Sequence, residues 1–131
     1  MQHLVWLRTA WSRDQLLNRI PDQELIDGDT SKAERLISDR ITATRSADGD
    51  YALVYSATGR NIRVKMNRLK APTADAFWFS PRNGKWNVIG VETDRMKPVK
   101  SKIVGGPSAI IVEFDPPGEV QSGNDWVLVL K

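Results

Sequence analysis

The sequence predicts an all-β fold, a small antiparallel sandwich of about six or seven strands with one amphipathic helix at its N-terminus. Three observations predict it. From residue 40 onward, apolar and polar side chains alternate with a period of two, as in half-buried strands. Asp48-Gly49, Thr58-Gly59 and Asn83-Gly84 separate these stretches with tight-turn signals. With 131 residues, the chain is long enough to bury the core of one domain without metals or disulfides.

Residues 1–20 are predicted to hold the helix. Leu7 and Trp11 lie on one face of it, and Pro21 ends it. The helix begins at the start of the sequence with no N-cap residue before it, which indicates a chain cut from something larger or a truncated gene. The stretch 21–39 is polar, contains proline and glycine, and is predicted to be a loop.

Two hairpins and one single strand follow. Residues 41–44 are predicted to pair with 51–56 across Asp48-Gly49. In 62–66, every second residue is apolar, so Ile62, Val64 and Met66 should point into the core. The second hairpin is predicted to run through 76–80 and to return through 85–91.

Both faces of this second hairpin are apolar. One face carries Phe79 and Trp86, and the other carries Trp78. A sheet in a two-layer sandwich normally has one wet face, so the Trp78 face is expected to meet a further element, for which the N-terminal helix is the candidate. The predicted interface residues on that helix are Trp6, Trp11 and Leu7.

The C-terminal third is predicted to hold a long loop and two strands. Residues 93–108 carry four basic side chains and the sequence Gly105-Gly106-Pro107, and they are predicted to form a basic loop. A strand at 109–114 stops before Pro116-Pro117. The last strand, 126–130, is apolar throughout, as expected of a strand covered on both faces.

Composition excludes several classes of function. The chain has no cysteine, which removes disulfides, thiolate metal sites and thiol catalysis. Its 19 basic and 16 acidic residues leave a net charge of +3, too weak a field to predict nucleic-acid binding. No apolar run approaches the length of a membrane span, and the N-terminus does not have the pattern of a signal peptide.

The residue types needed for catalysis do not form a recognisable set. His3 is the only histidine, so neither a metal site nor a serine–histidine–aspartate arrangement is predicted. Asp48, Asp50, Asp115 and Asp125 fall at turns, where side-chain hydrogen bonds to the backbone explain an aspartate. We therefore predict no enzyme activity, no metal and no cofactor for this chain.

Aromatic residues are the remaining binding material, and the chain has five tryptophans. Trp78 and Trp86 flank the turn at 81–84, where they could stack on a sugar ring or a proline-rich partner. Packing in the core is the alternative explanation. Arg60 and Arg82 lie at turns, where either a ligand contact or a turn-stabilising ion pair would account for them. The candidate binding residues are Trp78, Trp86, Arg82 and Arg60.

Short segments of the chain occur in the order found in one known family. They are 19–23 (RIPDQ), 41–45 (ITATR), Asp48-Gly49, 58–60 (TGR), 78–79 (WF), Pro81-Arg82, Gly84, Phe114, Pro116-Pro117 and 124–130 (NDWVLVL). In their order and spacing, residues 15–131 resemble the C-terminal domain called the collagen-binding domain of a collagenase. In that family, the domain typically follows a (β/α)8-barrel of the apiosidase-like glycoside hydrolase type.

The resemblance implies an immunoglobulin-like β-sandwich, residues 40–131, that serves as a non-catalytic accessory domain. The catalytic carboxylates would lie in the barrel, which is absent from this chain, and residues 1–20 would be the connector or a barrel remnant. The implied partner is therefore a catalytic barrel, in cis or in trans, and the implied location is secreted or periplasmic. The sequence departs from the family pattern in the basic stretch 93–108 and at Ser80, where an acidic residue is expected.

The alternative function is that of a module binding a polysaccharide or a collagen-like protein. An apolar surface left uncovered without the barrel would also allow a homodimer. Neither nucleic acid nor a membrane is a predicted partner.

Overall fold

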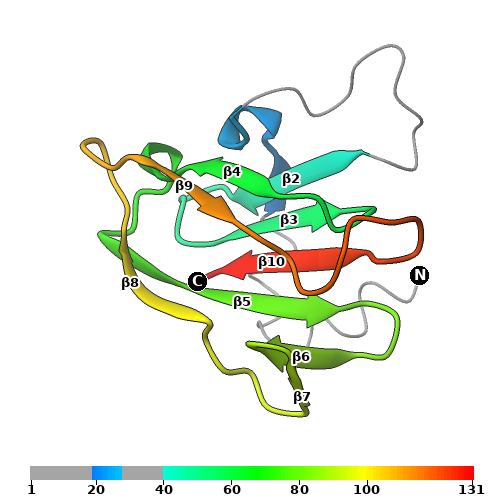
Figure 1. Cartoon of the computed structure of the whole chain (residues 1–131). Helices are drawn as coiled ribbons and strands as arrows, with labels where there is room; N and C mark the ends of the chain where they lie inside the picture. Colours follow the sequence, from blue (N-terminus) through cyan, green and yellow to red (C-terminus); the bar gives the residue numbers. More distant parts are fainter. Residues whose placement is uncertain (1–18, 28–39) are drawn as a thin grey trace.

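The computed structural model describes residues 19–27 and 40–131, and this part of the chain is all-β, as predicted. The strands form two antiparallel sheets (Figure 1). The larger sheet contains β1 (Arg19–Pro21), β2 (Ile41–Ser46), β3 (Ala52–Ser56), β5 (Thr73–Ser80), β6 (Lys85–Val88), β7 (Val91–Thr93), β8 (Lys100–Val104) and β10 (Trp126–Leu130). The smaller sheet pairs β4 (Ile62–Lys65) with β9 (Ile111–Phe114). These are more strands than the six or seven predicted, because β1, β7 and β8 lie where other structure was expected.

The centre of the larger sheet is built as the sequence predicts. β2 and β3 form the predicted antiparallel hairpin, with Ala43 opposite Val54. The last strand, β10, lies between β3 and β5, so Leu128 is flanked by Val54 and Trp78. All five side chains of β10 are buried, which confirms the prediction of a strand covered on both faces.

The main core lies between the two sheets. Ile62 and Val64 of β4 and Met66 are fully buried there, as their alternation predicts. Met66 itself belongs to a short 3-10 turn, η3 (Met66–Arg68), that ends β4. In Figure 1, β4 and β9 pass in front of the larger sheet and cover one of its faces.

The opposite face of the larger sheet carries a second apolar cluster. Its buried members are Tyr51, Leu53, Phe77, Phe79, Trp86, Val127 and Val129. The Phe79 and Trp86 rings meet edge to face, with their centroids 4.9 Å apart. The prediction that both faces of the second hairpin are apolar is therefore confirmed.

The Trp78 face meets a further element, as predicted, and the described strands that cover it are β4 and β9. Trp78 belongs to the core between the sheets, where its ring meets that of Trp126 edge to face at 6.4 Å. Strands β4 and β9 supply the apolar cover that we had assigned to the helix. Alternation shows that both faces are apolar, but it does not show which element covers each face. The predicted helical interface of Trp6, Trp11 and Leu7 lies outside the described residues.

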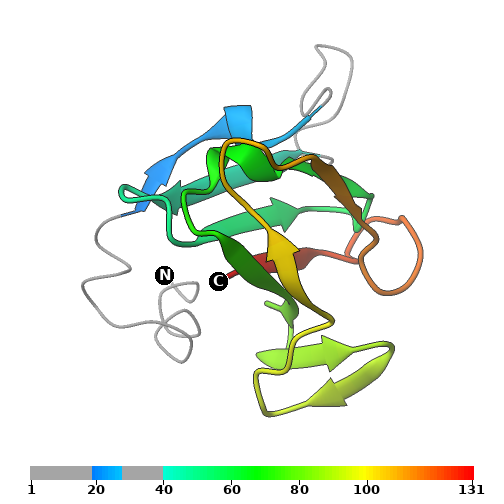
Figure 2. The same ribbon diagram turned by 90° about the vertical axis from the view of Figure 1, so that its left-hand side faces the viewer.

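One edge of β5 is shared between two strands. β6 pairs with the C-terminal half of β5, placing Trp78 opposite Asn87, and β8 pairs with its N-terminal half. The return strand predicted for 85–91 is broken by a two-residue turn at Ile89-Gly90, after which β7 pairs back onto β6. Figure 2 shows this β6–β7 hairpin extending away from the rest of the fold. The basic loop predicted for 93–108 likewise contains a strand, β8.

The described N-terminal segment packs against β2. Arg19–Pro21 form β1, which pairs with β2, where a helix end and the start of a loop were predicted. A 3-10 turn, η1 (Gln23–Leu25), follows, and the Gln23 amide bonds the backbone of β2 twice, at Ile41 O (2.9 Å) and Ala43 N (2.7 Å). No helix within the described ranges is long and apolar enough to cross a lipid bilayer.

Candidate functional site

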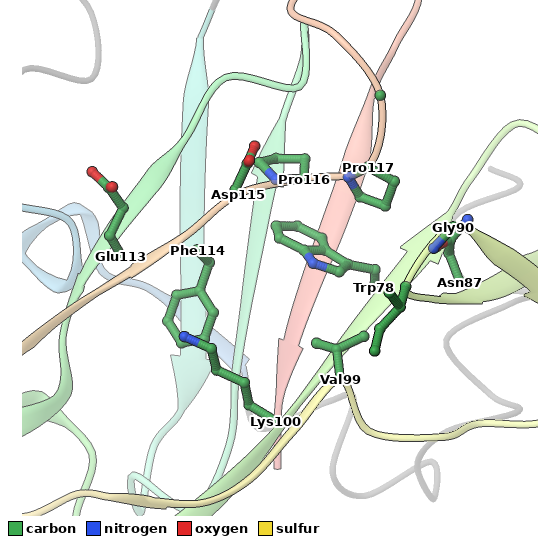
Figure 3. Close-up of a pocket in the computed structure, with 12 residues that line it drawn as sticks. Trp78, Asn87, Gly90, Val99, Lys100, Glu113, Phe114, Asp115, Pro116 and Pro117 are labelled. Carbon is green, nitrogen blue, oxygen red and sulfur yellow. The ribbon is translucent and has the colours of Figure 1, made fainter.

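The candidate site is a pocket at the edge of β5 that pairs with both β6 and β8. β6 and β8 separate there, and Trp78 of β5 forms the floor of a hollow of about 500 Å³. This volume lies within the range of about 300–1,000 Å³ that is usual for ligand pockets. β9 and the segment 115–118 that follows it form the opposite side (Figure 3).

The walls of this pocket are mainly apolar. Figure 3 shows Phe114, Pro116, Pro117 and Val99 arranged around the Trp78 ring. Trp78 is only 5% exposed, so it contributes a floor rather than an open stacking platform. A ligand would rest on this floor and touch the prolines and aliphatic side chains at the rim.

Two hydrogen-bond donors lie among these apolar walls. Asn87 is 7% exposed, and its Oδ1 accepts a bond from the Gly90 backbone N–H at 2.9 Å. Since Oδ1 faces that N–H, the Asn87 amide nitrogen faces elsewhere, and no residue in the described part of the chain bonds it. The second donor is Lys100, whose Nζ lies 5.4 Å from the centre of the Phe114 ring.

The carboxylates nearest to the pocket belong to Glu113 and Asp115. Both residues are exposed, and Figure 3 shows their carboxylates pointing away from the Trp78 ring. Neither one forms an ion pair with Lys100. The pocket lining therefore has two donors, Asn87 and Lys100, and two carboxylates at its border that point away from the Trp78 ring.

The turn at the mouth of the pocket is strained. Ile89 has a φ of 50°, in the left-handed region that β-branched residues avoid, and its side chain is 86% exposed. A two-residue hairpin loop of this kind strongly favours Asn-Gly, whereas the chain has Ile89-Gly90. The strained backbone and the exposed apolar side chain of Ile89 do not stabilise the fold. Their position beside a pocket therefore points to a functional role.

Arg82 lies in a separate cluster. Its guanidinium stacks over the Trp126 ring at 4.7 Å, and its Nε lies 3.1 Å from Asp125 Oδ1. The Tyr55 hydroxyl donates a hydrogen bond to the other oxygen of Asp125 at 3.0 Å. Burial and this bond to a carboxylate raise the pKa of Tyr55 to about 12. Arg82 thus has the ion pair that was one of its two predicted explanations.

The four predicted binding residues do not form one site. Trp78 lines the pocket, while Trp86 is 4% exposed and lies in the apolar cluster on the opposite face. Arg60 follows β3, and its carbonyl accepts a hydrogen bond from Ser56 at 3.1 Å.

Trp78 is the pocket residue that was predicted from the sequence as a binding residue, whereas Asn87, Ile89 and Lys100 were not among the predicted binding residues. The available signal for these residues was Ile89 before Gly90. Isoleucine is unsuited to a two-residue hairpin turn, and this turn was not predicted from the sequence. Within the described ranges, the acidic side chains form no cluster that could hold a metal ion, and His3 lies outside those ranges.

The described part of the chain has the fold of a small β-sandwich module with one candidate ligand pocket. Residues 20–131 match the family described as "Putative collagen-binding domain of a collagenase". The chain belongs to this family, as the resemblance in the sequence implied. No functionally curated protein is significantly similar to it in sequence.

Solved structures place the same module in larger proteins. A glycoside hydrolase family 5 protein from Bacteroides vulgatus is similar over 99% of this chain, with 27% identity and a TM-score of 0.69. A second protein, described as a glycoside hydrolase, is similar over 95% of this chain, with 26% identity and a TM-score of 0.67. In both cases, this chain spans 23% of the other protein. The module is an accessory domain of the kind found in glycoside hydrolases.

Proposed function

We propose that this chain is a non-catalytic accessory domain that packs against and supports a glycoside hydrolase barrel. The proposal rests on the extent of the two structural matches. Nearly all of this chain aligns with less than a quarter of each glycoside hydrolase. The family resemblance implies that the barrel holds the catalytic groups.

The carboxylates of the described part support a non-catalytic role. Asp22 and Asp125 are engaged by arginines, and Asp75 accepts a hydrogen bond from the Lys102 backbone N–H. Glu113 and Asp115 border the pocket, but both side chains are exposed to water rather than enclosed in it.

Exposed apolar side chains supply a candidate contact with the barrel. Val104 and Ile110 flank the connection from β8 to β9, and they are 60% and 75% exposed. Apolar side chains that water reaches in the isolated domain are suitable for burial against a neighbouring domain. We assign this face, with Ile111, to the barrel.

The test uses the barrel that is encoded in the same gene as this chain or in a neighbouring gene. The barrel is produced once together with this chain and once without this chain. Co-elution and a higher melting temperature of the barrel are expected. Ile110→Glu should abolish both effects, while Ser108→Glu, on the same connection, should leave them intact. A barrel that is equally stable without the domain and never co-elutes with it would overturn the supporting role.

Hydrolysis is tested separately on the chain alone, with plant and bacterial polysaccharides. No release of reducing sugar above the buffer control is expected. Activity that disappears in the double variant Glu113→Gln/Asp115→Asn would show instead that the domain is catalytic.

The pocket beside Trp78 favours a second candidate role, binding of a carbohydrate ligand that keeps the barrel near its substrate. Both predicted alternatives, polysaccharide and collagen-like protein, remain ligands to be tested at this pocket.

A further inference from the structure

We infer that the pocket beside Trp78 binds an acidic sugar residue, a pyranose that carries a carboxylate, within an anionic polysaccharide. The inference rests on the second role proposed above and adds the chemical class of the ligand. It is carried by the two unpaired donors among apolar walls and by the positive charge that surrounds them.

The donors define one side of the ligand. The Asn87 amide nitrogen and the Lys100 ammonium both need acceptors, and neither has a hydrogen-bond or ion-pair partner in the described part of the chain. Lys100 is exposed, and the Asn87 amide nitrogen is not among the fully buried unpaired atoms of the described residues, so both donors can exchange water for a ligand acceptor. A carboxylate satisfies an amide N–H and an ammonium together, and its charge strengthens both bonds.

The apolar walls define the other side of the ligand. Trp78 forms the floor of the hollow, Pro116 and Pro117 lie along one side of it, and Val99 and Ile89 also line it. A pyranose ring has an apolar face of C–H groups and a rim of hydroxyls, and so suits a pocket that is apolar at its base and open to water. A fully apolar ligand would leave both donors unpaired.

The surrounding charge selects an anion over a neutral sugar. Arg95, Lys97 and Lys102 lie on the segment that contains Lys100, all are exposed, and none forms an ion pair within the described ranges. The nearby Asp94 is already paired with Lys85, at 3.6 Å. This row of cations on one side of the pocket attracts a polyanion, while Glu113 and Asp115 on the other side direct their carboxylates away from the Trp78 ring.

The strained turn fits the same ligand. Ile89 extends the apolar wall at the mouth of the pocket, while the Asn87–Gly90 bond fixes the turn that holds it there. Replacing Ile89 by asparagine would suit the turn better and would remove the wall.

The experiment measures binding of a short oligogalacturonate to the whole chain by calorimetry. Its methyl ester, which keeps the rings and removes the charge, is the matched control ligand. We expect the acid to bind, its affinity to fall as salt is added, and the ester to bind about tenfold more weakly or worse. A sulfated oligosaccharide and a triple-helical collagen peptide complete the set of ligands.

Three variants locate the site. Asn87→Asp keeps the acceptor for the Gly90 N–H and replaces the amide donor with a repelling charge, so a loss of about tenfold or more is expected. Lys100→Ala should lose a similar factor, whereas Lys102→Ala, a control outside the pocket, should lose no more than about twofold. Ile89→Asn should raise the melting temperature and still weaken binding, which separates a binding defect from misfolding.

Each other outcome overturns the inference in a distinguishable way. Equal binding of acid and ester would keep a carbohydrate-binding role but reject an acidic ligand. Equal losses in Lys100→Ala and Lys102→Ala, with the sulfated ligand bound as well as the acid, would show nonspecific charge attraction. Binding of the collagen peptide alone would move the ligand to the other proposed class, and none of these results bears on docking to the barrel.

Discussion

Two guanidinium nitrogens of Arg68 donate hydrogen bonds to the carboxylate of Asp22. Its Nη2 lies 3.0 Å from Oδ1 and its Nε lies 3.1 Å from Oδ2, while Arg45 Nε approaches Oδ2 at 2.7 Å. Asp22 is buried between β1 and η1, whereas the arginines come from β2 and from the turn after β4. One carboxylate therefore joins the N-terminal segment to both sheets.

Removing that carboxylate should destabilise the fold. For Asp22→Asn, we expect the free energy of unfolding to fall by about 2 kcal/mol, below the ~3–5 kcal/mol of fully buried pairs because both arginines are partly exposed. Asp27→Asn is the control, since its bond from Arg63 Nε, 3.0 Å long, is more exposed and should be worth less than about 1 kcal/mol. Urea denaturation measures both losses, and equal losses would contradict the assignment.

The same carboxylate should make stability depend on acid. Burial on its own would raise the pKa of Asp22, but hydrogen bonds from Arg45 and Arg68 outweigh it and hold the pKa below the ordinary value. Because the folded state has the lower pKa, this contribution is complete above the unfolded pKa of about 3.9 and is lost as pH falls through the folded value. Melting temperatures of the natural chain should drop more steeply than those of Asp22→Asn over this interval.

Tyr55 should titrate at unusually high pH. Burial, followed by its bond to Asp125, raises its pKa to about 12, so the folded state favours the neutral hydroxyl. Its contribution to stability is therefore complete below about pH 10 and is lost as pH rises through about 12. Ultraviolet titration of phenolate formation should show this late step in the natural chain. Asp125→Asn should shift the step toward pH 10. The chain has one other tyrosine, Tyr51, so an unchanged amplitude of the step in Tyr55→Phe would refute the assignment.

Local alternation predicted the elements whose side chains are buried on one face or on both. It identified β2, β3, β4 and β10, because their apolar side chains meet the core at regular intervals. β8 was missed because Lys100, Ser101 and Lys102 carry no apolar pattern; this strand is held to the β5 edge by its backbone. Polar edge strands look like loops in a sequence.

The candidate site was only partly predictable, because four distant segments assemble it. Trp78 was singled out as an aromatic residue near a turn, which is a local signal. Its neighbours Asn87 and Lys100 come into place only when β6 and β8 divide the β5 edge, and that division depends on long-range pairing. The cover of each face of β5 is equally non-local, which is why β4 and β9 were not predicted to cover the Trp78 face.

Gly59 should resist substitution far more than Gly84. Both have positive φ values, 75° and 72°, so an alanine at either position has a similar backbone cost of about 1 kcal/mol. A Cβ at Gly59 would also lie 2.6 Å from the Asn124 backbone oxygen, whereas a Cβ at Gly84 would meet nothing. Gly59→Ala should therefore lose at least about 2 kcal/mol more than Gly84→Ala, measured by thermal unfolding. Similar losses would show that the Asn124 loop moves away easily.

The two apolar layers should both behave as core. Leu128 faces the smaller sheet and Phe79 faces the opposite side, and both side chains are fully buried. Leu128→Ala should cost about 2–5 kcal/mol and Phe79→Ala about 3–5 kcal/mol, because each leaves a cavity as well as losing buried area. Val104→Ala, at an exposed position, is the control and should stay within about 0.5 kcal/mol. If Phe79→Ala cost as little as Val104→Ala, the outer cluster would be a surface that folding does not require, and a partner would have to bury it. A large loss would instead show that the second layer stabilises the isolated domain, as expected if the barrel contacts the exposed apolar side chains of the β8–β9 connection.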